Sequence, residues 1–199
     1  MKIILIGASG TLGKAIDQQL QERHEILRVG HSSGELQVDI TDPASIRRLF
    51  EQTGRFDALV SATGKLHFGA LAEMTAEHYG IGLQDKLMGQ VNLVLIGREF
   101  ANDGASFTLT SGVLSDDPIR YGSSASMVNA AIDGFVRGAA IELPRGLRIN
   151  SVSPTVVEES LPTYGPYFRG FKPVPAAVAA LAFAKSVEGA QTGQVYRAL

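Results

Sequence analysis

The sequence predicts an α/β fold in which a single doubly wound parallel sheet is flanked by helices on both faces. Two observations support this prediction. Short apolar runs alternate with longer stretches of helical periodicity along the whole chain. The first apolar run is followed by a glycine-rich turn and then by a helical pattern. That order is typical of a strand, a phosphate-binding loop and a helix.

The same alternation predicts each element in turn. Strands are expected at Ile3–Ile6, Glu25–Val29, Leu36–Val38, Phe56–Val60, Ser106–Thr110, Arg148–Val152 and Gln194–Tyr196. Helices are expected at Lys14–Glu22, after Asp42 and Pro43, and at Ala76–Asn102, Met127–Leu143 and Ala176–Val187. Asp42 is a favourable N-cap, and Pro43 suits the first helical position. Ligands of such sheets bind at the carboxyl ends of the strands, where the glycine- and serine-rich turns of this chain fall.

Composition and charge exclude several classes of protein. The 199 residues are 45% hydrophobic, which predicts one domain over residues 1–199 with a substantial core. A net charge of −2 gives no electrostatic case for binding nucleic acid or an anionic membrane. The absence of cysteine excludes disulfides and thiolate catalysis, and the four histidines lack metal-ligand spacing. No stretch has the length of a membrane-spanning helix, and we expect a cytoplasmic protein without a metal.

The turn Gly7–Gly13 is expected to bind the diphosphate of a dinucleotide, which makes the fold Rossmann-type. Glycine lets the backbone turn sharply, and the helix N-terminus supplies free N–H groups to an anion. A plain strand-to-helix turn has the same glycine chemistry and is the alternative for the loop taken alone. The expected contacts are Gly7, Ser9, Gly10, Thr11, Leu12 and Gly13.

The end of the second strand predicts the choice of cofactor. An NAD-selecting site usually places Asp or Glu there to hold the ribose hydroxyls. This chain has Gly30 followed by His31, Ser32 and Ser33. Two hydroxyls, backbone amides and a histidine suit a phosphate better than a diol, so we predict NADP over NAD. The alternative is that the serines serve only the turn, and no arginine stands at the usual position.

Several short motifs, in a fixed order along the chain, match the motifs of a known family. They are Gly7–Gly13, Asp39-Ile40, Ser61-Ala62-Thr63-Gly64, Thr110-Ser111-Gly112, residues 130–135 and Arg148–Pro154. On these motifs the chain resembles the short-chain dehydrogenase/reductase family over nearly its whole length. The resemblance implies a hydrogen bond from Ser111 to the substrate oxygen and a homodimer or homotetramer formed through the two long helices. It implies cofactor contacts at Asp39, Ile40, Ser61, Ala62, Gly64, Asn129, Pro154 and Val156.

The catalytic pair of that family is missing. Counting back from Asp133-Gly134-Phe135, its Tyr-x-x-x-Lys pair falls on Ala125 and Asn129, and its helix asparagine falls on Lys86. Alanine has no proton to give, and asparagine carries no charge that would tune a phenol. Ser111, Tyr121 and Lys86 are the predicted substitutes, since Tyr121 lies one helical turn before Ala125. The alternative makes Tyr121 a loop aromatic and Lys86 a solvated or ion-paired residue.

The segment Glu158–Pro175 is rich in proline and aromatic residues. It predicts a stiff apolar lid over a small substrate, with a subunit contact as an equal alternative.

The sequence leaves two functions open. The first is an oxidoreductase that moves hydride between NADP(H) and a small carbonyl or alcohol. The second is a catalytically inactive NADP-binding sensor or regulatory protein, favoured by Ala125 and Asn129.

Overall fold

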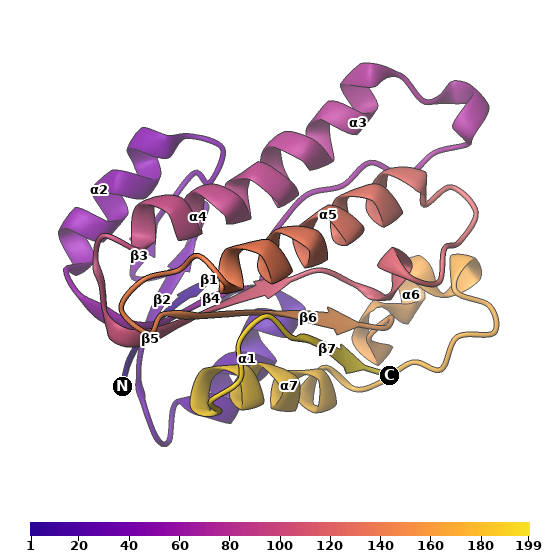
Figure 1. Cartoon of the computed structure of the whole chain (residues 1–199). Coiled ribbons are helices and arrows are strands. Elements are labelled where there is room, and N and C mark those ends of the chain that lie inside the picture. Colours follow the sequence, from indigo (N-terminus) through magenta and orange to yellow (C-terminus); the bar gives the residue numbers. More distant parts are fainter.

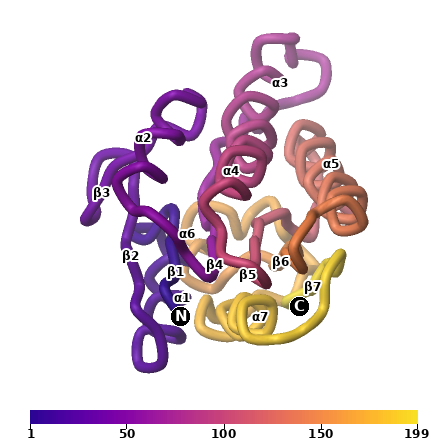
Figure 2. The backbone as a smooth tube through the Cα atoms, turned by 60° about the vertical axis from the view of Figure 1, so that its left-hand side comes forward, coloured from indigo at the N-terminus to yellow at the C-terminus, as the bar shows by residue number.

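Seven parallel strands form one sheet in the order β3-β2-β1-β4-β5-β6-β7 (Figures 1 and 2). The computed structural model describes all 199 residues. The strands are β1 Lys2–Ile6, β2 Glu25–Gly30, β3 Leu36–Gln37, β4 Phe56–Ser61, β5 Ala101–Thr110, β6 Arg148–Pro154 and β7 Val195–Ala198. Strand order reverses between β1 and β4, which confirms the predicted doubly wound sheet and places a ligand-binding crevice at their carboxyl ends.

Helices cover both faces of the sheet. They are α1 Thr11–Leu20, α2 Pro43–Thr53, α3 Ala76–Gly82, α4 Gly89–Gly97, α5 Ser123–Ala140, α6 Leu161–Tyr164 and α7 Ala176–Glu188. Helices α2 to α5 lie on one face, and α1 and α7 lie side by side on the other (Figures 1 and 2). No helix combines the length and the apolar character needed to cross a membrane.

Strand β1 shows why the sheet is buried on both sides. Ile4 and Ile6 pack with residues of α2, α4 and α5, whereas Ile3 and Leu5 pack with residues of α1 and α7. Side chains of a strand alternate between the two faces of the sheet, so a continuous apolar run fills both layers. The run Ile3–Ile6 was predicted as a buried strand on this ground, and the structure confirms it.

Several predicted helix bounds are wrong. Helix α1 begins at Thr11 instead of Lys14, because the glycine turn ends with Gly10 as its extended N-cap. The helical run from Ala76 ends at Gly97 instead of Asn102, since the amide of Phe100 closes a turn on the carbonyl of Gly97 at 2.9 Å. Helix α5 spans Ser123–Ala140 instead of Met127–Leu143. The early start of α5 leaves Tyr121 just outside the helix.

The segment Glu158–Pro175, which we call the lid, leaves the sheet after β6 and returns to α7. It consists of short helical turns that include α6. A parallel bridge between Val157 and Val174 closes its base. The carboxylate of Glu159 accepts hydrogen bonds from the amide of Ala176, at 3.0 and 3.1 Å, and so ties the lid to the first turn of α7. Both ends of the lid are thus fixed to the body of the domain.

Replacing Gly13 by alanine is expected to destabilise the fold. A Cβ atom at Gly13 would lie 2.1 Å from the carbonyl oxygen of Gly7 and 2.8 Å from the Cα of Ala8, both backbone atoms. The expected loss is about 1–3 kcal/mol of unfolding free energy, measured by urea denaturation. Gly134→Ala in α5 is the matched control, since a Cβ atom there meets nothing within 4 Å. The control is expected to gain about 0.5–1 kcal/mol, and equal effects of the two substitutions would contradict this account.

Candidate functional site

The turn Gly7–Gly13 joins β1 to α1 with its backbone packed closely against neighbouring strands. The amides of Gly7 and Ala8 both donate to the carbonyl of Val29, at 2.8 and 3.3 Å. Gly7 has φ +84°, and a Cβ atom there would lie 2.5 Å from the carbonyl oxygen of Ala62. Only glycine combines this backbone conformation with such a close approach.

The start of α1 offers unpaired amides. No side chain caps the helix, and the amides of Thr11, Leu12 and Gly13 donate no hydrogen bond within the chain. Ser9, Gly10 and Thr11 are exposed beside them. Free amides at the positive end of a helix dipole favour an anion. This cradle fits the diphosphate of a dinucleotide.

A cavity of about 180 Å³ lies beside the turn, and Gly7, His31, Asp39, Ile40 and Lys65 are among the residues that line it. The Asp39 carboxylate accepts from the hydroxyl and the amide of Thr41, at 2.7 and 2.9 Å. These hydrogen bonds hold the pKa of Asp39 below its usual value, with smaller contributions from nearby His31 and Lys65. Asp39 is therefore a charged hydrogen-bond acceptor in the wall of this cavity.

Arg28, the basic residue nearest the end of β2, forms ion pairs within the chain. Its guanidinium pairs with Asp17 at 2.9 Å and with Glu35 at 3.3 Å, and donates to the amide oxygen of Gln21 at 3.3 Å. The pairing also occupies Glu35, which is an acid close to this strand end. The turn after β2, formed by His31, Ser32 and Ser33, is exposed and accessible to a ligand.

A larger cavity of about 520 Å³ lies at the carboxyl ends of β4, β5 and β6. Lys86, Ser111 and Asn129 line it together. Of the other predicted residues, Leu12, Ala62, Gly64, Pro154 and Val156 also line it. Ser61 does not line it, because its side chain is buried at the end of β4. Predicted residues from six segments of the chain therefore meet in one place.

The Lys86 ammonium is buried in this cavity. Its side chain donates to Asn129 Oδ1 at 2.6 Å and to the Ser111 carbonyl at 2.9 Å. Burial lowers the pKa of Lys86 from 10.5 to about 8, and the negative charge of Asp133 partly opposes this effect. The backbone at Gly64 packs on the lysine stem, since a Cβ atom there would lie 2.3 Å from Lys86 Cγ.

A π-helical stretch, Leu83–Met88, carries Lys86 between α3 and α4. The side chain of Gln90 donates to the Lys86 carbonyl and to the Thr110 carbonyl, both at 3.0 Å, and accepts from the Thr110 amide at 2.9 Å. Wide turns of this kind are common at functional sites because they redirect side chains. Gln90 thus joins the lysine-bearing helix to the end of β5, which immediately precedes Ser111.

Ser111 has a hydroxyl that is weakly held within the chain. Its Oγ lies 3.4 Å from the Val152 carbonyl, at the long limit for a hydrogen bond. The Ser111 side chain lines the same cavity as Lys86. A hydroxyl with so weak a partner is available to a ligand oxygen.

Tyr121 does not join Ser111 and Lys86. It precedes α5 with φ +66°, is 42% exposed and lines a separate, neighbouring cavity. Ala125, at the position where the resemblance would place a tyrosine, is fully buried. The predicted grouping of three catalytic side chains therefore reduces to Ser111 and Lys86.

The sequence did not single out three residues of the larger cavity or its support. Phe68 and Tyr164 line the cavity, and Gln90 positions Lys86. Tyr164 belongs to the aromatic lid that was predicted as a whole, so only its individual place was missed. Gln90 and Phe68 carry no local sequence signal, since their roles depend on contacts with distant segments.

Comparison with known proteins gives consistent matches. A family model described as enoyl-(acyl carrier protein) reductase matches residues 7–197. An uncharacterized oxidoreductase of Methylorubrum extorquens is 27% identical over 187 residues, which cover 81% of this chain and 75% of that protein. Oxidoreductase UcpA of Escherichia coli is 27% identical over 163 residues, and the match spans 59% of its length.

Solved structures share the whole fold. The protein lin1944 of Listeria innocua is 53% identical, with a TM-score of 0.98 over 99% of this chain and 98% of that chain. A small-chain dehydrogenase in complex with NADPH is 23% identical, with a TM-score of 0.88 over 99% of this chain and 95% of that chain. The second likeness is one of fold alone.

The buried Lys86 predicts a pH-dependent stability. The unfolded lysine titrates near 10.5 and the folded one near 8, so the unfolded state binds the extra proton between these values. Stability relative to Lys86→Met is therefore expected to rise with pH across this interval, by on the order of 3 kcal/mol. Urea denaturation from pH 7 to about pH 10 measures the difference. The exposed Lys14, replaced by methionine, is the control, and a difference that stays flat with pH for Lys86→Met would refute the burial of its charge.

Proposed function

Because the chain belongs to the short-chain dehydrogenase/reductase family of oxidoreductases, we propose that it transfers hydride between NADP(H) and a small carbonyl or alcohol substrate. The observation that carries this proposal is the larger cavity. It brings the Lys86 ammonium and the Ser111 hydroxyl together at the strand ends, close to the dinucleotide turn. A basic group and a free hydroxyl in one crevice suit the handling of a substrate oxygen.

The chain offers binding groups for each part of the cofactor. The free amides at the start of α1 suit the diphosphate, Asp39 and Ile40 suit the adenosine, and Lys86 with Asn129 suits the nicotinamide ribose. When bound, the cofactor supplies or accepts the hydride.

NADP is the preferred cofactor in this proposal. No acid of the β2 end is free to hold a ribose diol, because Glu35 is paired with Arg28. His31, Ser32 and Ser33 offer a phosphate two hydroxyls, backbone amides and an imidazole in an exposed turn. A small-chain dehydrogenase of the same fold binds NADPH, which is compatible with this choice.

Ser111 and Lys86 are the proposed catalytic residues. The Ser111 hydroxyl donates a hydrogen bond to the substrate oxygen, which gains negative charge as the carbonyl is reduced. That oxygen must also gain a proton. The Lys86 ammonium, with a pKa of about 8, is an acid poised near neutral pH in the same cavity. Tyr121, which was predicted to complete this group, has no part in the proposed proton transfer.

A second function, an NADP-binding sensor without turnover, is favoured by one observation. Helix α5 presents Ala125 and Asn129 where the resemblance would place tyrosine and lysine, so no phenol of α5 reaches the cavity. Such a protein would bind the cofactor and leave carbonyl compounds unchanged.

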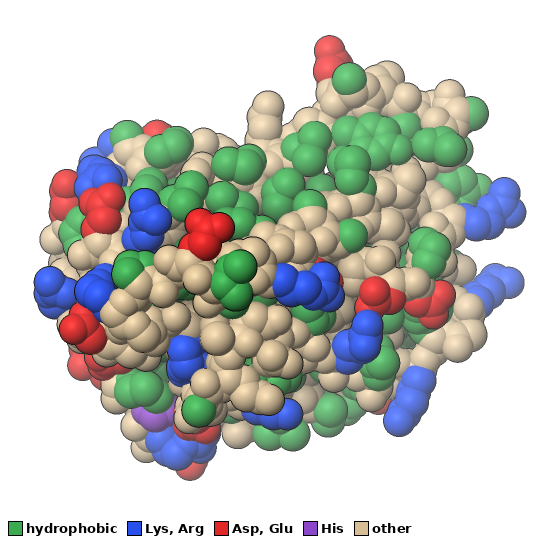
Figure 3. All heavy atoms as spheres, in the orientation of Figure 1, with side chains coloured by type: hydrophobic (Ala, Val, Ile, Leu, Met, Phe, Trp, Pro, Cys, Tyr) green, Lys and Arg blue, Asp and Glu red, His purple; other side chains and the backbone are tan.

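We also propose a homodimer or homotetramer assembled through α4 and α5. A groove of about 310 Å³ lies between the two helices, and Val94, Leu95, Phe135, Ala139 and Leu143 are among the residues that line it. Hydrophobic side chains gather along α3 and α4, beside α5, on the exposed surface (Figure 3). An exposed apolar surface of this kind is suited to a subunit contact.

The test of the proposed function combines cofactor binding with turnover. We expect calorimetry to give NADPH an affinity about tenfold higher than that of NADH, because the 2′-phosphate adds charge-assisted hydrogen bonds. We expect NADPH to be consumed with at least one member of a panel of aldehydes and ketones. Ser111→Ala is expected to lower kcat/KM about 100-fold. The control is Ser115→Ala, since Ser115 lies outside the cavity.

The outcomes separate the two functions. Consumption that Ser111→Ala abolishes and Ser115→Ala leaves intact supports the oxidoreductase. Tight binding of NADPH without consumption of any carbonyl supports the sensor. Failure of both cofactors to bind would contradict both functions.

A further inference from the structure

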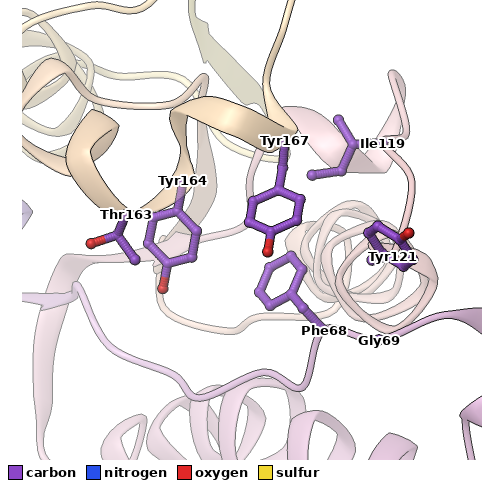
Figure 4. A pocket seen from close by; sticks show the side chains of 7 residues that line it. All are labelled: Phe68, Gly69, Ile119, Tyr121, Thr163, Tyr164 and Tyr167. Atoms are coloured by element: carbon purple, nitrogen blue, oxygen red, sulfur yellow. The ribbon is translucent and has the colours of Figure 1, made fainter.

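An aromatic cavity of about 450 Å³ adjoins the larger cavity (Figure 4). Its walls come from three segments at the same edge of the sheet. They are the loop after β4, the loop before α5, and the lid. The side chains that form the walls are Phe68, Ile119, Tyr121, Thr163, Tyr164 and Tyr167. Neither Ser111 nor Lys86, the two proposed catalytic residues, lines this second cavity.

The aromatic cavity and the larger cavity share part of their lining. Phe68 and Tyr164 line both cavities. A ligand held by its oxygen at Ser111 therefore has a second space beyond Phe68 and Tyr164 for the rest of its structure. The shared lining residues place the aromatic cavity directly beside the proposed substrate site.

Two aromatic pairs join the lid to the body around this cavity. The rings of Phe68 and Tyr164 have centroids 6.1 Å apart, and those of Tyr121 and Tyr167 have centroids 6.2 Å apart at nearly a right angle. In Figure 4 the hydroxyls of Tyr164 and Tyr167 lie on the Phe68 side of the lid. Each pair takes one ring from the body and one from the lid, so the two pairs set the width of the cavity.

Tyr121 is held in a strained backbone conformation. Its φ of +66° is rare for a bulky residue, and such strain persists where surrounding contacts impose it, often at ligand sites. The amide of Gly69 donates to the Tyr121 carbonyl at 3.0 Å and so ties two walls of the cavity together. In this conformation the exposed ring of Tyr121 lies at the wall of the cavity and not in the hydrophobic core.

The lining defines the chemistry of the ligand. None of its residues is charged, and four aromatic side chains on it, Phe68, Tyr121, Tyr164 and Tyr167, are 38–51% exposed. Aromatic walls favour flat apolar rings through stacked and edge contacts. A cationic ligand is disfavoured, because Arg120 already lies 5.8 Å from the Tyr121 ring centroid.

We propose that this cavity is a subsite for an uncharged aromatic or alicyclic ring of the substrate. The proposal rests on the proposed function, and it names the substrate class as ring-bearing aldehydes, ketones or alcohols. The ring lies between the body and lid aromatics, and its carbonyl or hydroxyl oxygen meets Ser111. Short aliphatic carbonyls fill the larger cavity only.

The test compares 4-phenylbutan-2-one, whose ring is separated from the carbonyl by two methylene groups, with butan-2-one on the NADPH-loaded protein. Tyr167→Ala removes one wall, and we expect it to lower the ratio of the two kcat/KM values about tenfold or more. Phe171→Ala is the matched control, because it truncates a lid aromatic that does not line the aromatic cavity. The control is expected to keep the wild-type ratio. A ratio that Tyr167→Ala leaves unchanged, or that both variants lower equally, would overturn the subsite.

A binding measurement keeps the proposal testable if the protein turns over no carbonyl. Calorimetric titration with 4-phenylbutan-2-ol is expected to show binding that Tyr167→Ala weakens and Phe171→Ala does not. Absence of NADPH consumption together with this pattern would reject the oxidoreductase and retain the ring subsite. Binding of 4-phenylbutan-2-ol that is equal in wild type and Tyr167→Ala would reject the subsite, whatever the turnover.

Discussion

The buried ammonium of Lys86 is the constraint on which the site depends. A cation removed from water must be held by good acceptors, and here the amide oxygen of Asn129 and the carbonyl of Ser111 are those acceptors. The π-helical stretch brings Lys86 to them, and Gln90 fixes that stretch to β5. The same contacts place Ser111 beside the lysine. One buried charge therefore organises the helix, the strand end and the cavity between them.

The position of this charge departs from the pattern that the resemblance implies. The resemblance places a lysine on α5, where this chain has Asn129, and an asparagine on the preceding helical region, where it has Lys86. The two residue types have exchanged places, and their side chains meet across the cavity at 2.6 Å. The ammonium is thus kept in the crevice while the tyrosine of the pair is lost to Ala125. The proposed proton transfer by Lys86 rests on this exchange.

The sequence was sufficient for the fold and for the position of the glycine turn because both depend on local pattern. Alternating apolar runs predicted the parallel sheet, and the spacing of Gly7, Gly10 and Gly13 predicted the turn. The partnership of Tyr121 with Lys86 was wrong because it assumed a helix extending upstream through Tyr121, whereas α5 begins at Ser123. The support that Gln90 gives and the aromatic cavity depend on side chains from segments far apart in the sequence, which no local pattern records.

Exchange of the two site residues tests this account most directly. NADPH affinity is measured by calorimetry for wild type, Lys86→Asn, Asn129→Lys and the double variant. We expect Lys86→Asn to weaken NADPH binding about tenfold or more, because a charge-assisted contact with the ribose is lost. The double variant, which carries the ammonium on α5, is expected to return to within about threefold of wild type. A double variant as weak as Lys86→Asn would contradict the claim that the ammonium in this cavity holds the cofactor.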